Sequence, residues 1–153
     1  MAFSHTTSRL AVQLQPRDNL LLYTTRDCFG NPARKRGRIV GHATVDSPVV
    51  HLDDPVTFGE RIFRVGCWLK LHLLAALGQG IELQAYVPRL HAFPNADAWS
   101  AYLRRTLVFL DDHDYDMLMT PLRAVAFQPS EAVAEYIALG ASLQHHRARK
   151  RSG

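Results

Sequence analysis

The sequence predicts one α+β domain, a small and mostly antiparallel sheet or barrel to which helices are appended. Short β-favouring runs alternate with turn residues and short helical stretches along the chain, which is typical of this class. The 153 residues are 47% hydrophobic and 21% charged, the balance of a globular domain rather than of a disordered chain. A chain of this length fits a single domain.

The first two predicted strands form a hairpin-like unit with a long basic tip. Residues 20–25 are an apolar, β-favouring run, and residues 38–45 are a second one. Gly41, inside the second run, indicates a bulge or a close approach of another backbone. Residues 26–37, rich in Gly, Pro, Asn and Arg, form the connecting loop.

Two further strands are predicted at residues 60–65 and 67–74, after a connection punctuated by Pro48 and residues 53–55. Side chains in the second of these strands alternate between two faces. The expected core face consists of Cys67, Leu69, Leu71 and Leu73. The expected partly solvated face consists of Trp68, Lys70, His72 and Leu74.

The second half of the chain carries most of the helical signals. Residues 83–90 are predicted as a short helical or irregular piece, 94–97 as a loop, 99–103 as one helical turn and 106–110 as a β-like run. Asp111 or Asp112 caps a helix that runs to Met119, where acidic side chains suit the positive helix end. Ser130 is the expected N-cap of a helix from 131 to about 143.

The ends of the chain are predicted to flank one central domain. Residues 1–17 form a helical or irregular segment with a short helix at 5–14, and residues 16–19 form a turn. The central domain spans residues 18–127. Residues 128–153 carry the last helix and a polar, frayed basic tail from 145 onward.

Charge favours a polyanionic partner. The net charge is +4, and the sequence pI is about 9.4. One basic cluster consists of Arg26, Arg34, Lys35, Arg36 and Arg38, and another of Arg147, Arg149, Lys150 and Arg151. The segment 26–38 has the donors that a phosphate-binding loop needs, although a solvated loop is the plain alternative.

The sequence does not support several classes of protein, among them membrane-spanning, disulfide-rich and zinc-binding proteins. No apolar run approaches the roughly 20 residues of a membrane helix, and no signal peptide is visible at the N-terminus. Cys28 and Cys67 stand far apart, which argues against a disulfide framework or a zinc knuckle and agrees with a cytoplasmic setting. No phosphate-loop, dinucleotide or zinc-protease motif occurs. We therefore expect no metal, no cofactor and no self-sufficient enzyme.

The sequence contains one candidate nucleophile and one candidate metal site, and for each we favour a simpler structural interpretation. Cys28 lies in the basic loop, where Arg26 would lower its pKa, but packing or a base contact is the simpler role. Residues 111–114 offer carboxylates for Mg²⁺, but a helix N-terminus explains them better. Cys67 alternates with apolar residues and is expected in the core.

Exposed aromatic rings would stack on bases. The candidates are Tyr23, Phe29, Trp68 and Trp99, and core packing is the alternative for each tryptophan. Arg104 and Arg105, beside Trp99, would hold a phosphate or cover apolar surface with their stems.

Three segments together resemble the EVE domain family of the PUA-like superfamily, which also includes ASCH and YTH domains. Residues 18–25 resemble its strand with a hydrophobic run followed by Tyr. Residues 38–45 resemble the next strand, where a glycine follows two apolar residues. Residues 99–105 resemble the turn before its last barrel strand, so that the match spans about residues 18–120.

The resemblance implies a PUA-like, mostly antiparallel β-barrel with short helices around it and a C-terminal helix. It also implies a pocket for a single, often modified, base of RNA or DNA. Tyr23, Thr24 and Thr25 would line this pocket, and Trp68 or Trp99 would form a wall. Phosphates would be held by Arg26, Arg36 and Arg105, and in our reading also by Arg34, Lys35, Arg38 and Arg104.

Three functions remain open at this point. The first is a nucleobase-binding module that is a monomer or a homodimer and has no membrane as a partner. The second is a protein-interaction or assembly subunit that pairs through an exposed strand edge. The third is a small nucleotide-acting hydrolase or transferase that uses Cys28 or the acidic cluster at 111–116.

Overall fold

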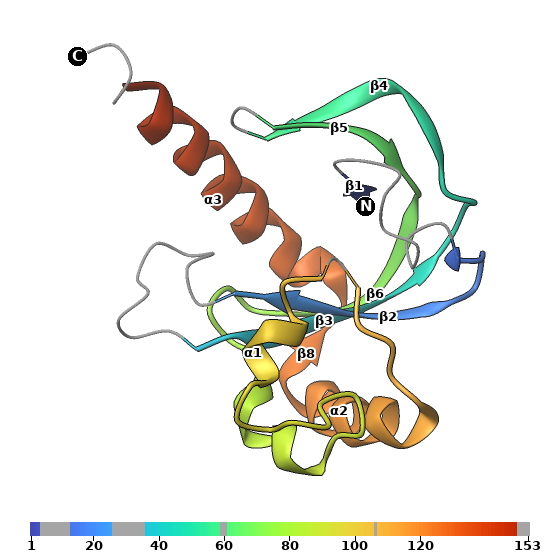
Figure 1. Cartoon of the computed structure of the whole chain (residues 1–153). Coiled ribbons are helices and arrows are strands. Elements are labelled where there is room, and N and C mark those ends of the chain that lie inside the picture. The colour runs from blue at the N-terminus through green and yellow to red at the C-terminus, as the bar shows by residue number, and fades with distance from the viewer. Residues whose placement is uncertain (4–12, 26–35, 59–60, 106, 150–153) are drawn as a thin grey trace.

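The computed structural model describes the chain except for residues 4–12, 26–35, 59–60, 106 and 150–153, and it describes residues 58 and 141–149 by their backbone alone. The chain is a mixed α+β protein with two antiparallel sheets, as Figure 1 shows. The predicted class is therefore confirmed. The described strands do not form a closed barrel.

The larger sheet has five strands. Its order is β2 (Asn19–Thr24), β3 (Arg38–Val45), β6 (Leu69–Ala75) and β8 (Ala126–Phe127), and β7 (Ile81–Glu82) also pairs with β3. The three-stranded smaller sheet has the order β1 (Ala2–Phe3), β5 (Arg61–Gly66) and β4 (Val50–Phe58). β2 is thus an edge strand whose partner is β3.

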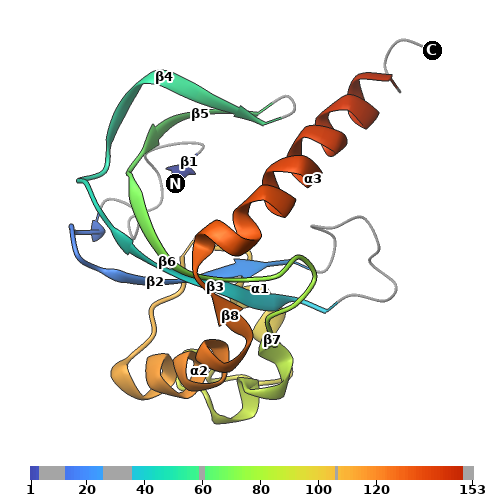
Figure 2. The same ribbon diagram turned by 180° about the vertical axis from the view of Figure 1, so that it is seen from behind.

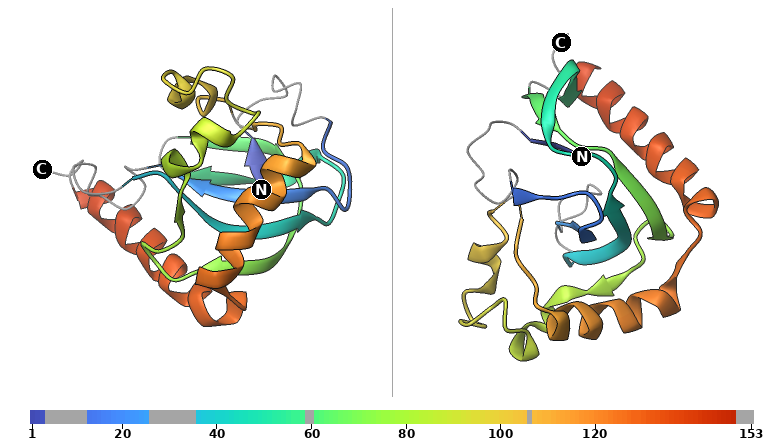
Figure 3. Two further views of the ribbon diagram at one scale, coloured as in Figure 1. Left: turned by 90° about the horizontal axis from the view of Figure 1, so that it is seen from below. Right: turned by 90° about the vertical axis from the view of Figure 1, so that its right-hand side faces the viewer.

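The helical segments are η2 (Leu83–Ala85), η3 (Val87–Arg89), α1 (Trp99–Tyr102), α2 (Asp112–Val125) and α3 (Pro129–Arg149). Figures 1 and 2 show α2 on one face of the larger sheet, with β4 and β5 arching over the opposite face. Figure 3 shows α3 along the outside of the curved strands. The main core lies between the larger sheet and α2, where Ile39, Phe93, Leu118 and Leu122 are buried together.

The predicted strands at 20–25 and 38–45 are confirmed as β2 and β3. The β2–β3 register shifts between Leu22, which pairs with Gly41, and Tyr23, which pairs with Ile39. A Cβ at position 41 would lie 2.7 Å from the carbonyl oxygen of Leu73. Gly41 therefore marks both a bulge and a close backbone approach, as predicted.

The predicted alternation of side chains between two faces over residues 67–74 is confirmed at Cys67 and Trp68 but is wrong at Leu74. Trp68 is exposed and Cys67 is buried, as expected, but Leu74 is buried as well. The register explains the change, because His42 pairs with Leu73 and the next residue, Ala43, pairs with Leu71. His72 is thus an extra residue in β6, and such a bulge breaks the alternation of side chains.

The sequence predicts a connection at residues 53–55, but this prediction is wrong. These residues lie inside β4. The β4–β5 register shifts between His51 and Val56, so several β4 residues lie opposite very few in β5. β4 is the edge of its sheet. Because an edge strand tolerates a residue without an N–H group, Pro55 is compatible with this position.

The helix starts were predicted better than the helix ends. Asp111 caps α2 by accepting a hydrogen bond from the backbone N–H of Asp114, but α2 continues past Met119 to Val125 because Met119 and Leu122 are buried in the core. α3 begins at Pro129, before the predicted cap Ser130, and proline is favoured in the first turn of a helix.

α3 also extends to Arg149, well into the tail that we expected to be frayed. The pieces at 83–90 and 99–103 are confirmed as two 3₁₀ turns and α1. Residues 107–110 are not a strand, contrary to the prediction. The expected helix at 5–14 falls mostly outside the described residues.

Candidate functional site

A groove of about 1470 Å³ runs along the edge of β2. Because β2 has only β3 as a neighbouring strand, side chains from both of its faces reach the groove. Leu20 and Leu22 line the groove from one face, and Leu21 and Tyr23 line it from the other. The opposite wall is formed by residues 107–112, which lead into α2.

The groove has apolar walls and acidic polar groups. Its carboxylates belong to Asp18, Asp111, Asp112 and Asp116, and its described cationic side chain is that of Arg105. Asp18 is already engaged, since it accepts a hydrogen bond of 2.8 Å from the backbone N–H of Gln15. The groove therefore offers more hydrogen-bond acceptors than positive charges.

Tyr23 and Thr25 contribute to the groove, whereas Thr24 does not. The Tyr23 side chain lies across Gly37, where a Cβ would overlap its hydroxyl group. Burial raises the pKa of Tyr23 above its ordinary value, so its hydroxyl stays protonated and can donate. The Thr24 hydroxyl donates instead to the carbonyl oxygen of Arg38, at 3.3 Å.

The two tryptophans lie apart, and neither lines the groove. Trp68 is 74% exposed between β5 and β6, where its backbone N–H donates to the Ser47 hydroxyl at 2.9 Å. Trp99 is half-buried against the core and meets Phe93 edge-on, with ring centroids 6.3 Å apart. Phe93 itself lines the groove.

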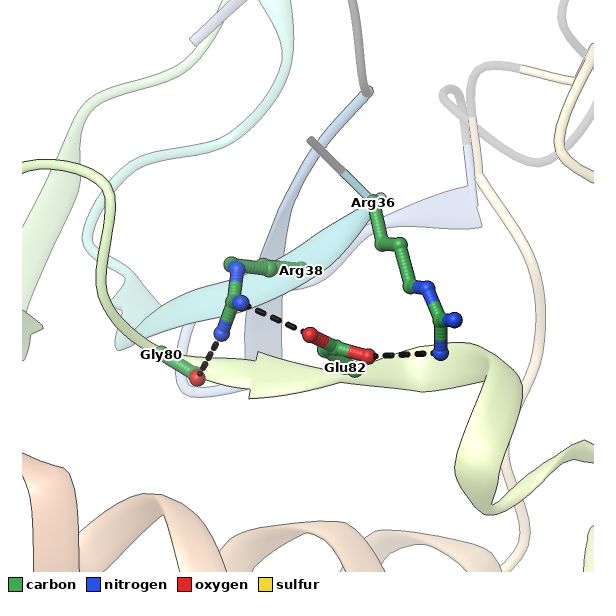
Figure 4. Close-up of polar contacts among 4 residues, drawn as sticks. All are labelled: Arg36, Arg38, Gly80 and Glu82. Carbon is green, nitrogen blue, oxygen red and sulfur yellow. Dashed lines mark hydrogen bonds and ion pairs between the residues drawn. The ribbon is translucent and has the colours of Figure 1, made fainter. Parts of the chain in front are cut away.

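Arg36 and Arg38 share one carboxylate, that of Glu82 on β7 (Figure 4). The Arg36 Nη1 atom lies 3.1 Å from Glu82 Oε2, and Arg38 Nη2 lies 2.8 Å from Glu82 Oε1. Arg38 also donates to the carbonyl oxygen of Gly80 at 2.8 Å. Two cations against one anion leave a net positive charge beside the end of β2.

The remaining predicted phosphate contacts have different positions. Arg105 is exposed and lines the groove, and Arg104 is exposed outside it. Arg26, Cys28, Phe29, Arg34 and Lys35 lie outside the described residues.

The acidic constellation at the start of α2 is a structural clamp. Both Asp114 carboxylate oxygens accept backbone N–H groups, from His91 at 2.9 Å and from Ala92 at 2.7 Å. Asp111 accepts from the Asp114 N–H at 2.9 Å through Oδ1 and contacts His91 Nδ1 at 2.8 Å through Oδ2. The carboxylate oxygens of Asp111 and Asp114 thus hold the start of α2 to the loop before it, as expected of a helix terminus. The ligand atoms of His91, Asp111 and Asp114 also lie within 4.8 Å of one another, a grouping that could hold a metal ion.

Sequence reasoning missed a polar cluster on the face of the larger sheet next to α2. His42 on β3 and His72 on β6 stack with ring centroids 5.2 Å apart. His42 Nε2 lies 3.0 Å from Asn19 Oδ1 and 3.1 Å from the Tyr115 hydroxyl. Strand alternation places His42 and Thr44 on one face, but the bulge that adds His72 cannot be read from the sequence.

Within the described residues, no helix is long and apolar enough to cross a membrane. Comparison of the sequence with models of known families gave no match, and comparison with curated proteins gave none either. The likeness to EVE domains therefore stays a prediction, and the case for function depends on the groove and its surroundings.

Proposed function

We propose that the chain binds a nucleobase, modified or unmodified, of RNA or DNA in the groove along β2. The observation that carries this proposal is that one groove contains Tyr23, Thr25 and Arg105, three residues predicted from sequence for base and phosphate contacts. Small-molecule pockets commonly enclose about 300–1,000 Å³. At about 1470 Å³, the groove has room for a base and its adjoining sugar.

The lining supports a planar ligand that carries amino groups. Apolar walls exclude water from the two faces of a base, and the Tyr23 ring adds an aromatic surface. Asp112 and Asp116 form no ion pair within the described part of the chain. Because carboxylates accept hydrogen bonds from exocyclic amino groups, bases such as cytosine are favoured over uracil.

Positive charge for the phosphates lies close to the same strand. Thr24 pairs directly with Arg38 in the β2–β3 register, and Arg36 and Arg38 together exceed the charge of Glu82. Arg105 provides a further guanidinium on the groove itself. Phosphate contacts position a nucleic acid, and contacts to base edges specify it.

Fluorescence polarisation with labelled single-stranded RNA and DNA, together with calorimetry on nucleosides, tests the proposal. Tyr23→Leu should weaken binding about 5- to 160-fold, because a stacked base contributes roughly 1–3 kcal/mol. Arg105→Ala should weaken binding and lower the slope of log K against log salt by about one. Arg61→Ala, an exposed arginine on β5, is the matched control and should leave binding unchanged.

Two outcomes would contradict the proposal. One is the absence of binding by all nucleosides and oligonucleotides at low salt. The other is an equal loss of affinity in Arg61→Ala and Arg105→Ala, which would mean that net charge, and not the groove, determines binding.

A specific observation favours a second candidate, strand addition by a protein partner. β2 has one edge that no described strand covers, and the groove follows this edge. An extended peptide can pair with such an edge through its backbone. Self-association or peptide capture that Leu22→Pro abolishes, in a chain with no affinity for nucleic acid, would support this candidate instead.

A further inference from the structure

The polar cluster beside the groove consists of His42, His72, Thr44, Tyr115 and Asn19. Besides the contacts of His42, the His72 Nε2 atom lies 2.9 Å from the Thr44 hydroxyl. The bulge in β6 brings His72 to the face that carries His42, because a bulge turns the extra side chain toward another direction. Two imidazoles are thus stacked with only neutral hydrogen-bond partners.

Within the described residues, no carboxylate hydrogen-bonds to either histidine of this cluster. The groups around His42 are Asn19 from β2, Thr44 from its own strand, His72 from β6, and Tyr115 and Arg123 from α2. No described acidic side chain forms an ion pair with His42, His72 or Arg123. Asp116, which follows Tyr115 on α2, is the acidic group that affects this tyrosine.

Burial is the main influence on the pKa of His42, and neighbouring positive charge adds to it. Burial lowers the pKa of His42 below 6.5, and His72 and then Arg123 lower it further. A lone anion at this place would reverse the effects of His72 and Arg123, because it would attract protonated imidazoles and the guanidinium together. Lys70, exposed and opposite Thr44 in the β3–β6 register, adds another positive charge at the rim.

The cluster is continuous with the groove. Asn19 and Tyr115, the two hydrogen-bond partners of His42 Nε2, both line the groove. A ligand in the groove would therefore meet the cluster at these two residues, since His42 and His72 do not themselves line the groove. The two regions differ in chemistry, since the groove walls are apolar and acidic whereas the cluster consists of imidazole, amide and hydroxyl groups.

We propose that His42, His72 and Arg123, with the hydroxyl groups of Thr44 and Tyr115, bind a phosphate group at the end of the groove. This inference deepens the proposed function, because the phosphate would be that of the nucleotide whose base occupies the groove. Protonated histidines and arginine bind phosphate through charge-assisted hydrogen bonds, and hydroxyl groups complete the oxyanion shell. Bound phosphate would raise the pKa of His42, because it would oppose the positive charge that lowers it.

Histidine resonances of the full chain, followed by NMR during pH titrations, test the site. Inorganic phosphate alone should raise the pKa of His42 and shift the His72 resonances in a saturable manner, and the resonances of His113, an exposed histidine on α2, should not respond in the same way. Arg123→Gln should weaken this binding at least about fivefold, since it removes a charge-assisted contact. Arg64→Gln, an exposed arginine on β5, should leave it unchanged.

Further ligands separate this inference from the proposed function. A nucleoside alone should shift Tyr23 resonances and not the histidine pKa values, and a nucleoside monophosphate should shift both. Phosphate binding without binding of any nucleoside or oligonucleotide would support the anion site and contradict the proposed base-binding function. Oligonucleotide binding that leaves His42 and His72 unaffected, or phosphate binding equal in Arg123→Gln and Arg64→Gln, would overturn this inference.

Discussion

Asp114 is the one charged side chain that is fully buried among the described residues. Its two oxygens hold the backbone N–H groups of His91 and Ala92, so the loop after η3 is bound to the first turn of α2. Removal of the carboxylate leaves two backbone donors without an acceptor. Unsatisfied buried donors are costly, at about 1–3 kcal/mol each.

We therefore expect Asp114→Ala to lower the free energy of unfolding by roughly 2–4 kcal/mol. Asp112→Ala is the control, because Asp112 is exposed in the same helical turn and loses only its interaction with the helix N-terminus, at most about 1 kcal/mol. Urea denaturation followed by circular dichroism measures both. Equal losses in the two variants would show that the clamp contributes nothing specific.

The contact between His91 and Asp111 makes stability depend on pH in two directions. The hydrogen bond and charge of Asp111 raise the pKa of His91 above 6.5, so its stabilisation is complete below 6.5 and is lost as pH rises through the folded value. The hydrogen bond from the Asp114 N–H, followed by that from His91, lowers the pKa of Asp111 below 3.8. Its stabilisation is present above 3.8 and is lost as pH falls through the folded value.

Melting temperatures between about pH 3 and pH 9 should show both effects. His91→Ala should reduce the decline on the alkaline side of pH 6.5, because the group responsible is removed. His51→Ala, an exposed histidine on β4, is the control and should keep the decline. A His91→Ala profile that parallels the wild type above that pH would contradict this assignment.

At the scale of the element, bulges determine which side chains share a face. β3 carries Gly41 beside one bulge, and β6 has its extra residue at His72. The glycine is needed because the Leu73 carbonyl group lies where a side chain would start. The same pairing of β3 with β6 also brings the two histidines together. The packing around Gly41 and the proposed phosphate site therefore both depend on the bulged pairing of these two strands.

Gly41→Ala should therefore destabilise the protein by about 1–3 kcal/mol, the usual cost of overpacking. Gly140→Ala in α3 is a matched substitution with the opposite expected sign. Nothing lies within 4 Å of a Cβ at position 140, and alanine favours a helix over glycine by about 0.5–1 kcal/mol. Thermal unfolding of both variants measures the difference, and destabilisation by Gly140→Ala as large as that by Gly41→Ala would contradict the explanation.

The elements that local signals determine could be predicted, and those that depend on distant partners could not. The strands at 20–25 and 38–45, the Gly41 bulge and the Asp111 cap follow from neighbouring residues. Residues 107–110 have a β-favouring sequence, but no strand pairs with them in the described structure. Residues 53–55 resemble a turn, but they belong to β4, because an edge strand with an irregular register can include such residues.

At the scale of the whole molecule, the candidate site joins segments that no sequence window contains. The strand β2 was predicted from its apolar run, whereas the resemblance to EVE domains led us to expect Tyr23 and Thr25, the residue after β2, in a pocket. The opposite wall comes from the segment before α2, and the histidine cluster combines β3, β6 and α2. Trp68 and Trp99 have the right chemistry for stacking but lie outside the groove, since their positions are decided by tertiary packing.

Apolar side chains are more deeply buried in the larger sheet than in the smaller one. This difference in burial predicts which sheet unfolds locally first. In β3, Ile39, Val40, Ala43 and Val45 are each at most 3% exposed. In β4 and β5, Val50, Val56 and Ile62 are each at least 47% exposed. Local opening requires less free energy where few apolar contacts are lost, so the smaller sheet should open while the larger sheet and α2 remain folded.

Native-state hydrogen exchange should therefore show backbone amides of β3 exchanging at least about tenfold more slowly than those of β4, a difference of roughly 1.4 kcal/mol in opening free energy. Leu122→Ala, which removes a fully buried side chain between α2 and the larger sheet, should accelerate exchange in both sheets, because it lowers global stability. Ile62→Ala should accelerate exchange in β4 and β5 alone, since its side chain is 47% exposed. Equal protection of β3 and β4 in the unaltered protein would mean that both sheets unfold as one cooperative unit, and that the exposed side chains of the smaller sheet do not weaken it.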